Sequence, residues 1–426
     1  MSIKLDNVST FSGRTDIPGD KSVSHRSLIF GAISDGTTEV TNLLDSGDVQ
    51  STESCLRALG AEFKRTQDRV LVTGRGLHGL HPSEEVLDCG NSGTTIRTMM
   101  GLLAGQSFSS GMTGDQSIQR RPMKRAAEPL RKMGAKIELT REDFAPITIR
   151  GTNLVGVDYD LKVASAQVKT ALLLAGLYAS GTTTVRGSIG TRDHTERMLP
   201  HFGVRIRKTA SEISITSGQK LIASPVRVPG DPSSAAFWMG AASIVKDGMV
   251  EIENVCLNPT RTGFFEVLRR MGAKIEQEIT CESPEPIGNI RVTCQSLRAT
   301  EVSPDEIPSM VDEVPLLAIV ASQAEGTTIV HGAEELRVKE SDRLEAVATN
   351  LRAMGARIET FKDGYSITGP QKLHGAVINS FDDHRIAMSF AVASLIAKGT
   401  TEIQNHECVM ISYPRFFEVL RRLSRA

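Results

Sequence analysis

Positive charge stands at the starts of several predicted apolar helices in this chain. Lys21, Lys169, His384 and Arg385 lie where the backbone of a helix N-terminus already carries partial positive charge. Such placement is unfavourable by a few tenths to about 1 kcal/mol per residue. Sequences break local rules of this kind mostly at functional sites, and a bound anion would reverse the sign of the effect. The pattern therefore predicts that these helix starts bind anions.

Ordinary capping is the alternative explanation for the polar residues at the same helix starts. Ser, Asn and Asp side chains accept hydrogen bonds from the free backbone N–H groups of a helix N-terminus. Capping explains a helix start less well where a cation stands in its first turn. For Asp231 and Ser233, capping and ligand binding remain equally open.

Three polar loops carry further cations, at residues 119–123, 190–196 and 337–343. Charged runs are usually solvated surface, which is the alternative for all three. In the third loop, however, three basic residues interleave with Glu340 and Asp342, which combines phosphate-binding groups with titratable carboxylates. Several arginines are the expected apparatus for ligands that each carry a carboxylate and a phosphate.

The elements that would position these residues repeat along the chain. The phrase LRKMGAKIEL at residues 130–139 recurs in variant form from residues 56, 199, 268, 351 and, truncated, 420, roughly 70 residues apart. In each full copy a glycine stands where an amphipathic helix would end and an alternating segment follows, which predicts a helix, a glycine cap and a strand. A second strand follows, and an apolar helix running into a β-rich Gly-Thr-Thr stretch completes the unit. Since this period is too long for the common solenoids, six compact α/β units are expected.

A larger symmetry divides the repeats into two groups of three. Residues 17–22 (IPGDKS) and 228–233 (VPGDPS) are alike, and their Pro-Gly pairs suit tight, irregular backbone. We therefore expect the chain to cross between two domains at these points. One domain would comprise residues 1–18 and 229–426, and the other residues 19–228.

Composition excludes several classes of partner. The 426 residues include 49 basic and 50 acidic ones, so the net charge of −1 gives no general reason to bind nucleic acid or a membrane surface. The six cysteines form no C-x-x-C pair and no cluster with metal-ligand spacing. Since neither a signal core nor an apolar run of spanning length is present, a cytoplasmic protein is expected.

Seven motifs together resemble those of the 5-enolpyruvylshikimate-3-phosphate synthase family. In chain order they are GDKSVSHRS (19–27), GNSGTTIR (90–97), RPM (121–123), SAQVK (165–169), TRDHTE (191–196), RVKESDR (337–343) and DDHRIAM (382–388). With NPTR at residues 258–261, several of these forms resemble the class II branch. The resemblance implies the enolpyruvyl transferase fold: an α/β protein of two domains, an inside-out α/β barrel built from six βαβαββ repeats, three per domain, with the active site in the cleft between them.

The resemblance also implies the substrates and the residues that bind them. The residues expected to hold shikimate 3-phosphate are Lys21, Ser22, Arg26, Ser165, Ala166, Gln167, Arg192, Asp312 and Lys339. Those expected to contact phosphoenolpyruvate are Lys21, Gly93, Arg121, Gln167, Arg343 and Arg385, and those expected beside the site are Asn91, Thr94 and His384. No metal or organic cofactor is implied, the chain is expected to be a monomer, and glyphosate is expected to compete with phosphoenolpyruvate.

The implied reaction is addition of the shikimate 5-hydroxyl to C2 of phosphoenolpyruvate with protonation of C3, followed by loss of phosphate. Asp312 is the expected base, with plain helix capping as its alternative. Lys21 and Glu340 are the candidates for delivering and later removing the C3 proton. The rival functions are a UDP-N-acetylglucosamine enolpyruvyl transferase and an inactive protein that binds anions or RNA ends. The joint presence of Lys21, Asp312, Glu340 and Arg385 argues against an inactive site.

The sequence departs from class I members of the family at three positions. Ile411 stands where class I has a lysine, Glu335 where it has an amide, and Thr98 where it has a proline. Gly93, by contrast, lacks the methyl group that makes some class II members tolerant of glyphosate. We therefore expect intermediate inhibition by glyphosate.

Overall fold

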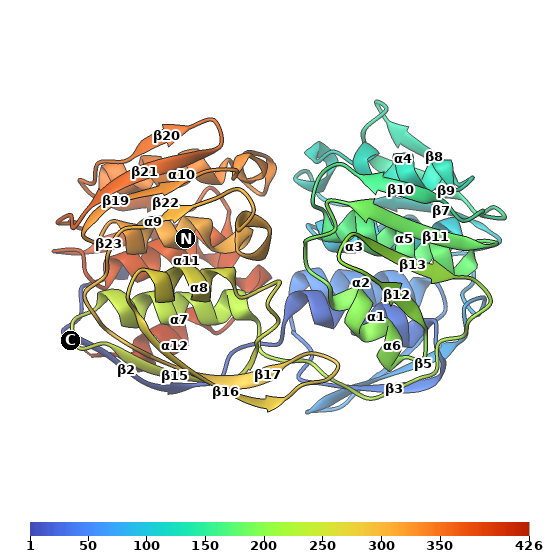
Figure 1. Ribbon diagram of the computed structural model, residues 1–426, viewed down its shortest axis with the longest axis horizontal. Helices are drawn as coiled ribbons and strands as arrows, with labels where there is room; N and C mark the ends of the chain where they lie inside the picture. The colour runs from blue at the N-terminus through green and yellow to red at the C-terminus, as the bar shows by residue number, and fades with distance from the viewer. Residues whose placement is uncertain (426) are drawn as a thin grey trace. The chain divides into compact units, whose positions relative to one another are not determined.

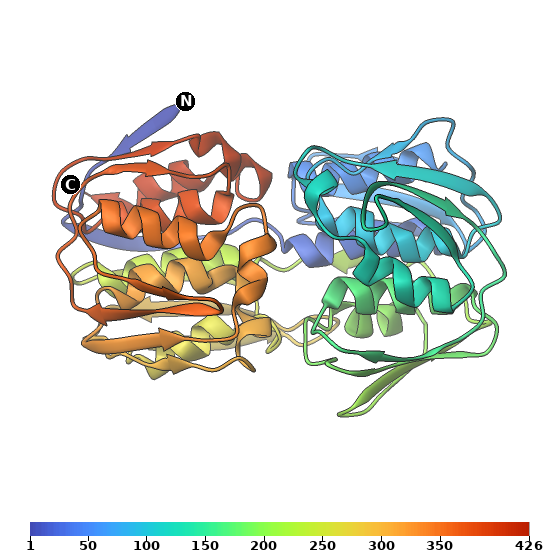
Figure 2. The ribbon, with the colours of Figure 1, turned by 90° about the horizontal axis from the view of Figure 1, so that it is seen from above.

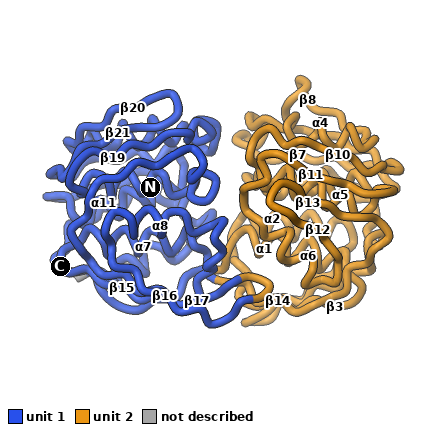
Figure 3. The backbone as a smooth tube through the Cα atoms, viewed as in Figure 1, with its two compact units in different colours: residues 1–18, 230–282, 286–426 blue, residues 19–229, 283–285 orange. Residues whose placement is uncertain are grey.

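The computed structural model describes residues 1–425 and divides into two compact units (Figure 3). Unit 1 comprises residues 1–18, 230–282 and the chain from 286 onward, and unit 2 comprises residues 19–229 and 283–285. Three open sheets belong to each unit.

The middle repeat of unit 2 shows the repeated order in full. Its elements are β6 (Leu87–Asp88), α3 (Gly93–Ala104), β7 (Ser109–Thr113), α4 (Lys124–Lys132), β8 (Lys136–Thr140) and β9 (Phe144–Arg150). β6 and β7 are parallel, whereas β9 runs antiparallel to both β7 and β8. After α4, Gly134 adopts a φ of +99° and turns the chain into β8, which is the glycine cap predicted from the repeat.

The other two repeats of unit 2 follow the same order. One contains β10 (Asp158–Leu161), α5 (Ala166–Tyr178), β11 (Thr182–Gly187), α6 (His194–His201), β12 (Ile206–Lys208) and β13 (Glu212–Thr216). The other contains α1 (Lys21–Ala32), β3 (Asp35–Thr41), α2 (Gly47–Ala58), β4 (Glu62–Arg65) and β5 (Arg69–Arg75). Its first strand is β14 (Val226–Arg227), which pairs in parallel with β3, so the end of the unit completes its first repeat.

Unit 1 is built in the same way. Its first repeat contains β2 (Thr10–Thr15), α7 (Pro232–Ile244), β15 (Met249–Cys256), α8 (Gly263–Arg270), β16 (Lys274–Cys281) and β17 (Ile287–Thr293). Its second contains β18 (Glu301–Val302), α9 (Val314–Ala321), β19 (Gly326–Val330), α10 (Arg343–Ala353), β20 (Glu359–Phe361) and β21 (Gly364–Gly369). β2 pairs in parallel with β15, so this strand from the first 18 residues lies in the same sheet as strands from the second half of the chain.

The last repeat of unit 1 is shorter. It contains β22 (Val377–Asn379), α11 (His384–Ser394), β23 (Thr401–Gln404) and α12 (Phe416–Leu423), and β1 (Ser2–Leu5) pairs antiparallel with β23. β24 (Ser424–Arg425) pairs with β2. Short 3₁₀ turns complete the described chain: η1 (Ile118–Arg120), η2 (Ile307–Ser309), η3 (Val311–Glu313), η4 (Glu334–Val338) and η5 (His406–Ile411).

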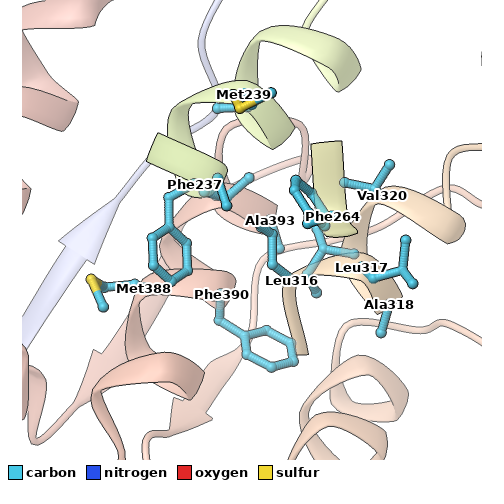
Figure 4. Packing of buried hydrophobic residues seen from close by; sticks show 14 of the residues in the cluster. Phe237, Met239, Phe264, Leu316, Leu317, Ala318, Val320, Met388, Phe390 and Ala393 are labelled. Atoms are coloured by element: carbon cyan, nitrogen blue, oxygen red, sulfur yellow. The ribbon is translucent and has the colours of Figure 1, made fainter. Parts of the chain in front are cut away.

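Helices form the interior of each unit. α3 and α5 in unit 2, and α7, α9 and α11 in unit 1, are buried along nearly their whole length. A helix that is apolar on all sides is a core helix, and Figures 1 and 2 show the sheets lying outside these helices within each unit. Figure 4 shows this packing in unit 1, where Phe237, Phe264, Leu316 and Phe390 come together from four helices.

The α/β fold class is confirmed, with helices inside and sheets outside in each unit. Among the described residues no single sheet closes on itself, because each pairs only three to five strands and keeps two edges. The boundaries of the two units differ slightly from those expected from the sequence. Pro229 lies with unit 2, where its carbonyl accepts a hydrogen bond from Asp20 N at 2.7 Å. Residues 283–285 lie there too, because the Glu285 carboxylate is buried against His194.

Candidate functional site

Three helix starts meet within unit 2, and each is capped by its own side chain. Asp20 accepts from Val23 N at the start of α1, Ser92 from Thr95 N at the start of α3, and Ser165 from Val168 N at the start of α5. Capping is therefore the observed structural role of these three side chains. It leaves the first residues of the helices, including Ser22 and Ala166, half-buried rather than enclosed.

Lys21 opens α1 and pairs with a carboxylate of the neighbouring helix. Its Nζ lies 3.0 Å from Asp48 Oδ2 in α2, and its side chain is 21% exposed. Beneath this pair a buried chain of hydrogen bonds joins α1, α2 and α3: His25 Nδ1 to Thr52 Oγ1 at 2.7 Å, Thr52 to Thr95 at 2.6 Å, and Thr95 to Ser92 at 2.7 Å. Burial lowers the pKa of His25 to about 3, so this imidazole is neutral at pH 7.

Arg26, one turn further along α1, is almost fully buried. Its Nε donates to Thr195 Oγ1 at 2.8 Å and its Nη2 to Thr170 Oγ1 at 2.7 Å, while Nη1 donates to the Ser22 carbonyl at 2.9 Å. Burial lowers its pKa to about 10, with Glu196 the largest opposing influence. The guanidinium is therefore still charged at pH 7, and its orientation is held by α5 and α6.

The glycine loop before α3 is bordered by two arginines. A Cβ atom on Gly93 would stand 2.9 Å from Arg97 Nη1 and 3.2 Å from Arg121 Nη1. Gln167 bridges this loop and α5, since its Oε1 accepts from Arg97 at 2.8 Å and its Nε2 donates to Thr94 Oγ1 at 3.1 Å. Only the absence of a side chain at Gly93 leaves this room beside the two guanidinium groups.

Asn91 ties the glycine loop to the loop that carries Arg121. Asn91 Nδ2 donates to Asp115 at 2.7 Å, and Arg121 donates to Asn91 Oδ1 at 3.4 Å. Behind the loop, Thr98 donates to the Thr94 carbonyl at 2.7 Å, a hydroxyl bond within α3 that a proline could not make.

Lys169 corrects the prediction that every cation at a helix start serves a bound anion. Its side chain is 1% exposed and pairs with the buried Glu196 at 2.6 Å, and it donates to the carbonyls of Ile189 at 3.1 Å and Thr191 at 3.3 Å. The unfavourable charge at the helix start is thus offset by an internal carboxylate. Lys169 anchors the loop that carries Arg192.

In unit 1, Arg343 is enclosed by three carboxylates. Its side chain is 2% exposed, and it donates to Asp383 through Nε at 2.8 Å, to Asp312 through Nη1 at 3.1 Å and to Glu340 through Nη2 at 2.7 Å. Burial favours the neutral form of Arg343, but the carboxylates outweigh it and raise its pKa far above the ordinary value. This one cation fixes the positions of both predicted acid–base carboxylates.

Arg385 lies in the first turn of α11, which Asp383 caps through Arg385 N. Its guanidinium is 3.9 Å from the buried Glu313 and 5.9 Å from the centroid of the Phe237 ring. Burial is the largest influence on Glu313 and raises its pKa, although Arg385 opposes the shift. His384, the first residue of α11, is also buried.

Lys339 and Ile411 show what accompanies two departures from class I. Lys339 Nζ forms an ion pair with the Glu335 carboxylate at 3.0 Å. The carboxylate that replaces the class I amide therefore pairs with Lys339, a residue predicted to bind shikimate 3-phosphate. Ile411, at the position of the class I lysine, ends η5 and is half-buried.

Asp231 and Ser233, left open by the sequence, have a structural role. Both bond to the buried Arg261 at 2.9 Å, and Asp231 also caps α7. Within the described part of the chain, no group of His, Cys, Asp and Glu residues could hold a metal ion. No helix described is long and apolar enough to cross a membrane.

Comparison with known proteins decides the family. Residues 5–420 match the family model described as EPSP synthase (3-phosphoshikimate 1-carboxyvinyltransferase). The chain belongs to the EPSP synthase family. A Bacillus subtilis relative named 3-phosphoshikimate 1-carboxyvinyltransferase is 48% identical over 426 residues, covering 99% of this chain and all of its own. A Bacillus licheniformis relative of the same name is also 48% identical.

Solved structures agree with this assignment. The EPSP synthase of Acinetobacter baumannii has a TM-score of 0.89 and 43% identity, and the match covers 99% of this chain and 98% of that one. The enolpyruvyl transferase NikO from Streptomyces tendae has a TM-score of 0.78 with 18% identity, covering 99% and 96%, which shows that the fold is shared. The family, the fold class and the enzyme class predicted from the sequence are confirmed.

Sequence reasoning missed several partners of the predicted residues. Asp48, Arg97, Glu313 and Asp383 each contact a predicted site residue. Arg97 and Asp383 lie inside the recognised motifs and Glu313 adjoins the predicted base Asp312, so their positions in the sequence were the available signal. Nothing in the linear sequence identifies Asp48 as the partner of Lys21, because that pairing exists only once α1 and α2 pack together.

Proposed function

We propose that this protein transfers the enolpyruvyl group of phosphoenolpyruvate to the 5-hydroxyl of shikimate 3-phosphate, yielding 5-enolpyruvylshikimate 3-phosphate and phosphate. The observation that carries the proposal is the match to the EPSP synthase family over residues 5–420. It is supported by the hydrogen-bonded cations Lys21 and Arg26 of α1 in unit 2 and by the Asp312–Arg343–Glu340 cluster of unit 1.

Unit 2 supplies most of the groups for shikimate 3-phosphate. Arg26, Arg192 and Lys21 are cations suited to its phosphate and carboxylate, and Ser22, Ser165 and Gln167 are polar groups suited to hydrogen bonding with it. The backbone of Ala166, at the start of α5, adds the partial positive charge of a helix N-terminus. Lys339 and Asp312 complete the proposed set from unit 1.

The proposed phosphoenolpyruvate ligands are Lys21, Gly93, Arg121, Gln167, Arg343 and Arg385. Gly93 lets the backbone approach the ligand beside Arg121. Arg343 already donates to three carboxylates. Its contact with the substrate therefore exchanges one of these hydrogen bonds for a substrate oxygen. Asn91, Thr94 and His384 are proposed to lie beside these phosphoenolpyruvate ligands; Asn91 bonds to Arg121 and Thr94 to Gln167.

The proposed mechanism proceeds by addition and elimination. Asp312 accepts the proton of the 5-hydroxyl as that oxygen bonds to C2, and Lys21 or Glu340 gives a proton to C3. In the second step the C3 proton is removed and the bond from C2 to the phosphate oxygen breaks. Arg343 holds Asp312 and Glu340 in place, and the surrounding cations stabilise the charge that moves to the phosphate.

A phosphate-release assay with a panel of acceptors tests this proposal. Phosphate is expected from phosphoenolpyruvate only when shikimate 3-phosphate is added, and not with UDP-N-acetylglucosamine. Release with the nucleotide sugar would favour the rival enolpyruvyl transferase. No release with either acceptor would favour an inactive anion-binding protein.

We further propose that the protein is a cytoplasmic monomer inhibited by glyphosate. The nearly neutral net charge and the scattered cysteines support an ordinary cytoplasmic enzyme. Sedimentation equilibrium is expected to give a mass near 46.1 kDa. A mass near twice that value would contradict the monomer.

A further inference from the structure

The turn between β16 and β17 carries a carboxylate that neither the motifs nor the mechanism uses. Glu282 and Ser283 in this turn are exposed, whereas the Glu285 side chain is only 2% exposed. Although the flanking strands lie in unit 1, residues 283–285 belong to unit 2. A carboxylate is rarely buried at the tip of a hairpin unless it is paired, because desolvation of the charge is costly.

The partner of Glu285 is the first residue of α6. Glu285 Oε1 lies 2.8 Å from His194 Nδ1, and the His194 side chain is fully buried. This hydrogen bond between two buried side chains fixes the orientation of the imidazole.

Every residue at the start of α6 is held in a similar way. Asp193 pairs with Arg197 at 2.9 Å and with Lys208 at 2.9 Å. Thr195 accepts from Arg26, and Glu196 pairs with Lys169. Because Arg192 directly precedes this anchored turn, its backbone position depends on the same contacts.

Glu285 also acts on the charges of this region. Burial lowers the pKa of Arg26, while the carboxylates of Glu196, Asp20 and Glu285 oppose this shift and Arg192 adds to it, so these groups lie close enough to influence one another. Two cations gathered at one anionic substrate repel each other when no anion is bound. A nearby buried carboxylate reduces that repulsion.

We propose that Glu285 is a positioning residue for Arg26 and Arg192, acting through its buried hydrogen bond to His194 at the start of α6. The inference rests on the proposed function, because it takes both arginines as ligands of shikimate 3-phosphate. Glu285 itself touches neither substrate. Its effect is therefore on the affinity for one substrate rather than on the chemical step.

Calorimetric binding of shikimate 3-phosphate to the full-length protein tests the proposal. Glu285→Ala is expected to weaken this affinity by about tenfold or more, because a charge-assisted hydrogen bond is lost. Glu285→Gln keeps an acceptor for His194 and is expected to recover most of the loss. Glu282→Ala, at an exposed position of the same turn, serves as the matched control and is expected to bind as the wild type does.

Steady-state kinetics separate positioning from general damage. In Glu285→Ala the KM for shikimate 3-phosphate is expected to rise in parallel with the dissociation constant of this substrate. The KM for phosphoenolpyruvate and kcat are expected to change less than about threefold. Unaltered affinity in Glu285→Ala, or equal losses for both substrates, would overturn this inference while the wild-type reaction still stands. Failure of the wild type to bind shikimate 3-phosphate would overturn the proposed function and this inference together.

Discussion

Asp312 is held for proton transfer by the guanidinium of Arg343, which donates to its Oδ1 at 3.1 Å. Asp312→Asn keeps the shape and this acceptor oxygen but cannot take a proton. We expect turnover to fall by about 100-fold or more, while shikimate 3-phosphate affinity stays within about tenfold. Stopped assays of the variant and of Asp305→Asn, an exposed control, measure the effect. Turnover in Asp312→Asn equal to the control would remove Asp312 as the base.

Arg385 combines a proposed ligand role with a structural one. Arg385→Ala is expected to weaken phosphoenolpyruvate binding by about 1.5–3 kcal/mol, because a charge-assisted contact is lost. The buried Glu313 would also lose its nearest cation, so the variant is expected to be less stable. The double variant Arg385→Ala/Glu313→Gln removes that buried charge as well.

Calorimetry of both Arg385 variants separates the two roles. If Arg385 is a ligand, the loss of phosphoenolpyruvate affinity persists in the double variant while shikimate 3-phosphate affinity changes little. Recovery of phosphoenolpyruvate affinity in the double variant would show that Arg385 acts only by neutralising Glu313.

At the scale of elements, the start of α3 depends on a missing side chain. A methyl group at Gly93 would displace the ends of Arg97 and Arg121, so it would crowd any anion between them and the loop. Gly93→Ala is expected to weaken inhibition by glyphosate strongly, at some cost in phosphoenolpyruvate affinity. Gly47→Ala, also at the start of a helix but with open space around the added methyl, is the control. A wild type as resistant as Gly93→Ala would contradict this placement.

The contact between α1 and α2 is expected to be sensitive to pH through His25. Burial lowers its pKa from 6.5 to about 3, with Lys21 and Arg26 adding to the shift and Asp48 opposing it. Below pH 6.5 the unfolded state therefore binds a proton that the folded state excludes, and stability falls as the pH falls towards 3. Between pH 6.5 and pH 5 this amounts to roughly 2 kcal/mol.

Urea unfolding at several pH values measures this dependence. His25→Asn is expected to lose less stability than the wild type over the same interval, whatever its stability at pH 7. Identical slopes in the two proteins would show that His25 does not resist protonation in the fold.

Elements were more predictable than the contacts between them. The recurring phrase located helix, glycine cap and strand because those signals are local, as at Gly134. The role of Lys169 was mispredicted, since its partner Glu196 is 27 residues away and meets it only when α5 and α6 pack. The burial of Glu285 could not be predicted from the sequence either, because no local pattern at a hairpin turn indicates which side chain will be buried by a distant element.

At the scale of the whole molecule, the fold was predicted mainly from the sequence phrase that recurs roughly every 70 residues. The six sheets recur with the same strand order in most repeats, and two pairings, β2 with β15 and β14 with β3, connect distant parts of the chain. The likeness of residues 17–22 and 228–233 indicated where the chain passes from one unit to the other. Pro229 lies with unit 2, and its carbonyl accepts a backbone hydrogen bond from Asp20 N, a contact that no sequence pattern specifies.

The central claim is that one chain carries out enolpyruvyl transfer to shikimate 3-phosphate. Phosphorus NMR of the wild type mixed with both substrates tests it most directly, because it resolves every phosphorus-containing reactant and product. Phosphoenolpyruvate and shikimate 3-phosphate are expected to disappear in equal amounts while inorganic phosphate and one new phosphate monoester appear in the same amounts. Phosphate formed without consumption of shikimate 3-phosphate, or no change at all, would contradict it.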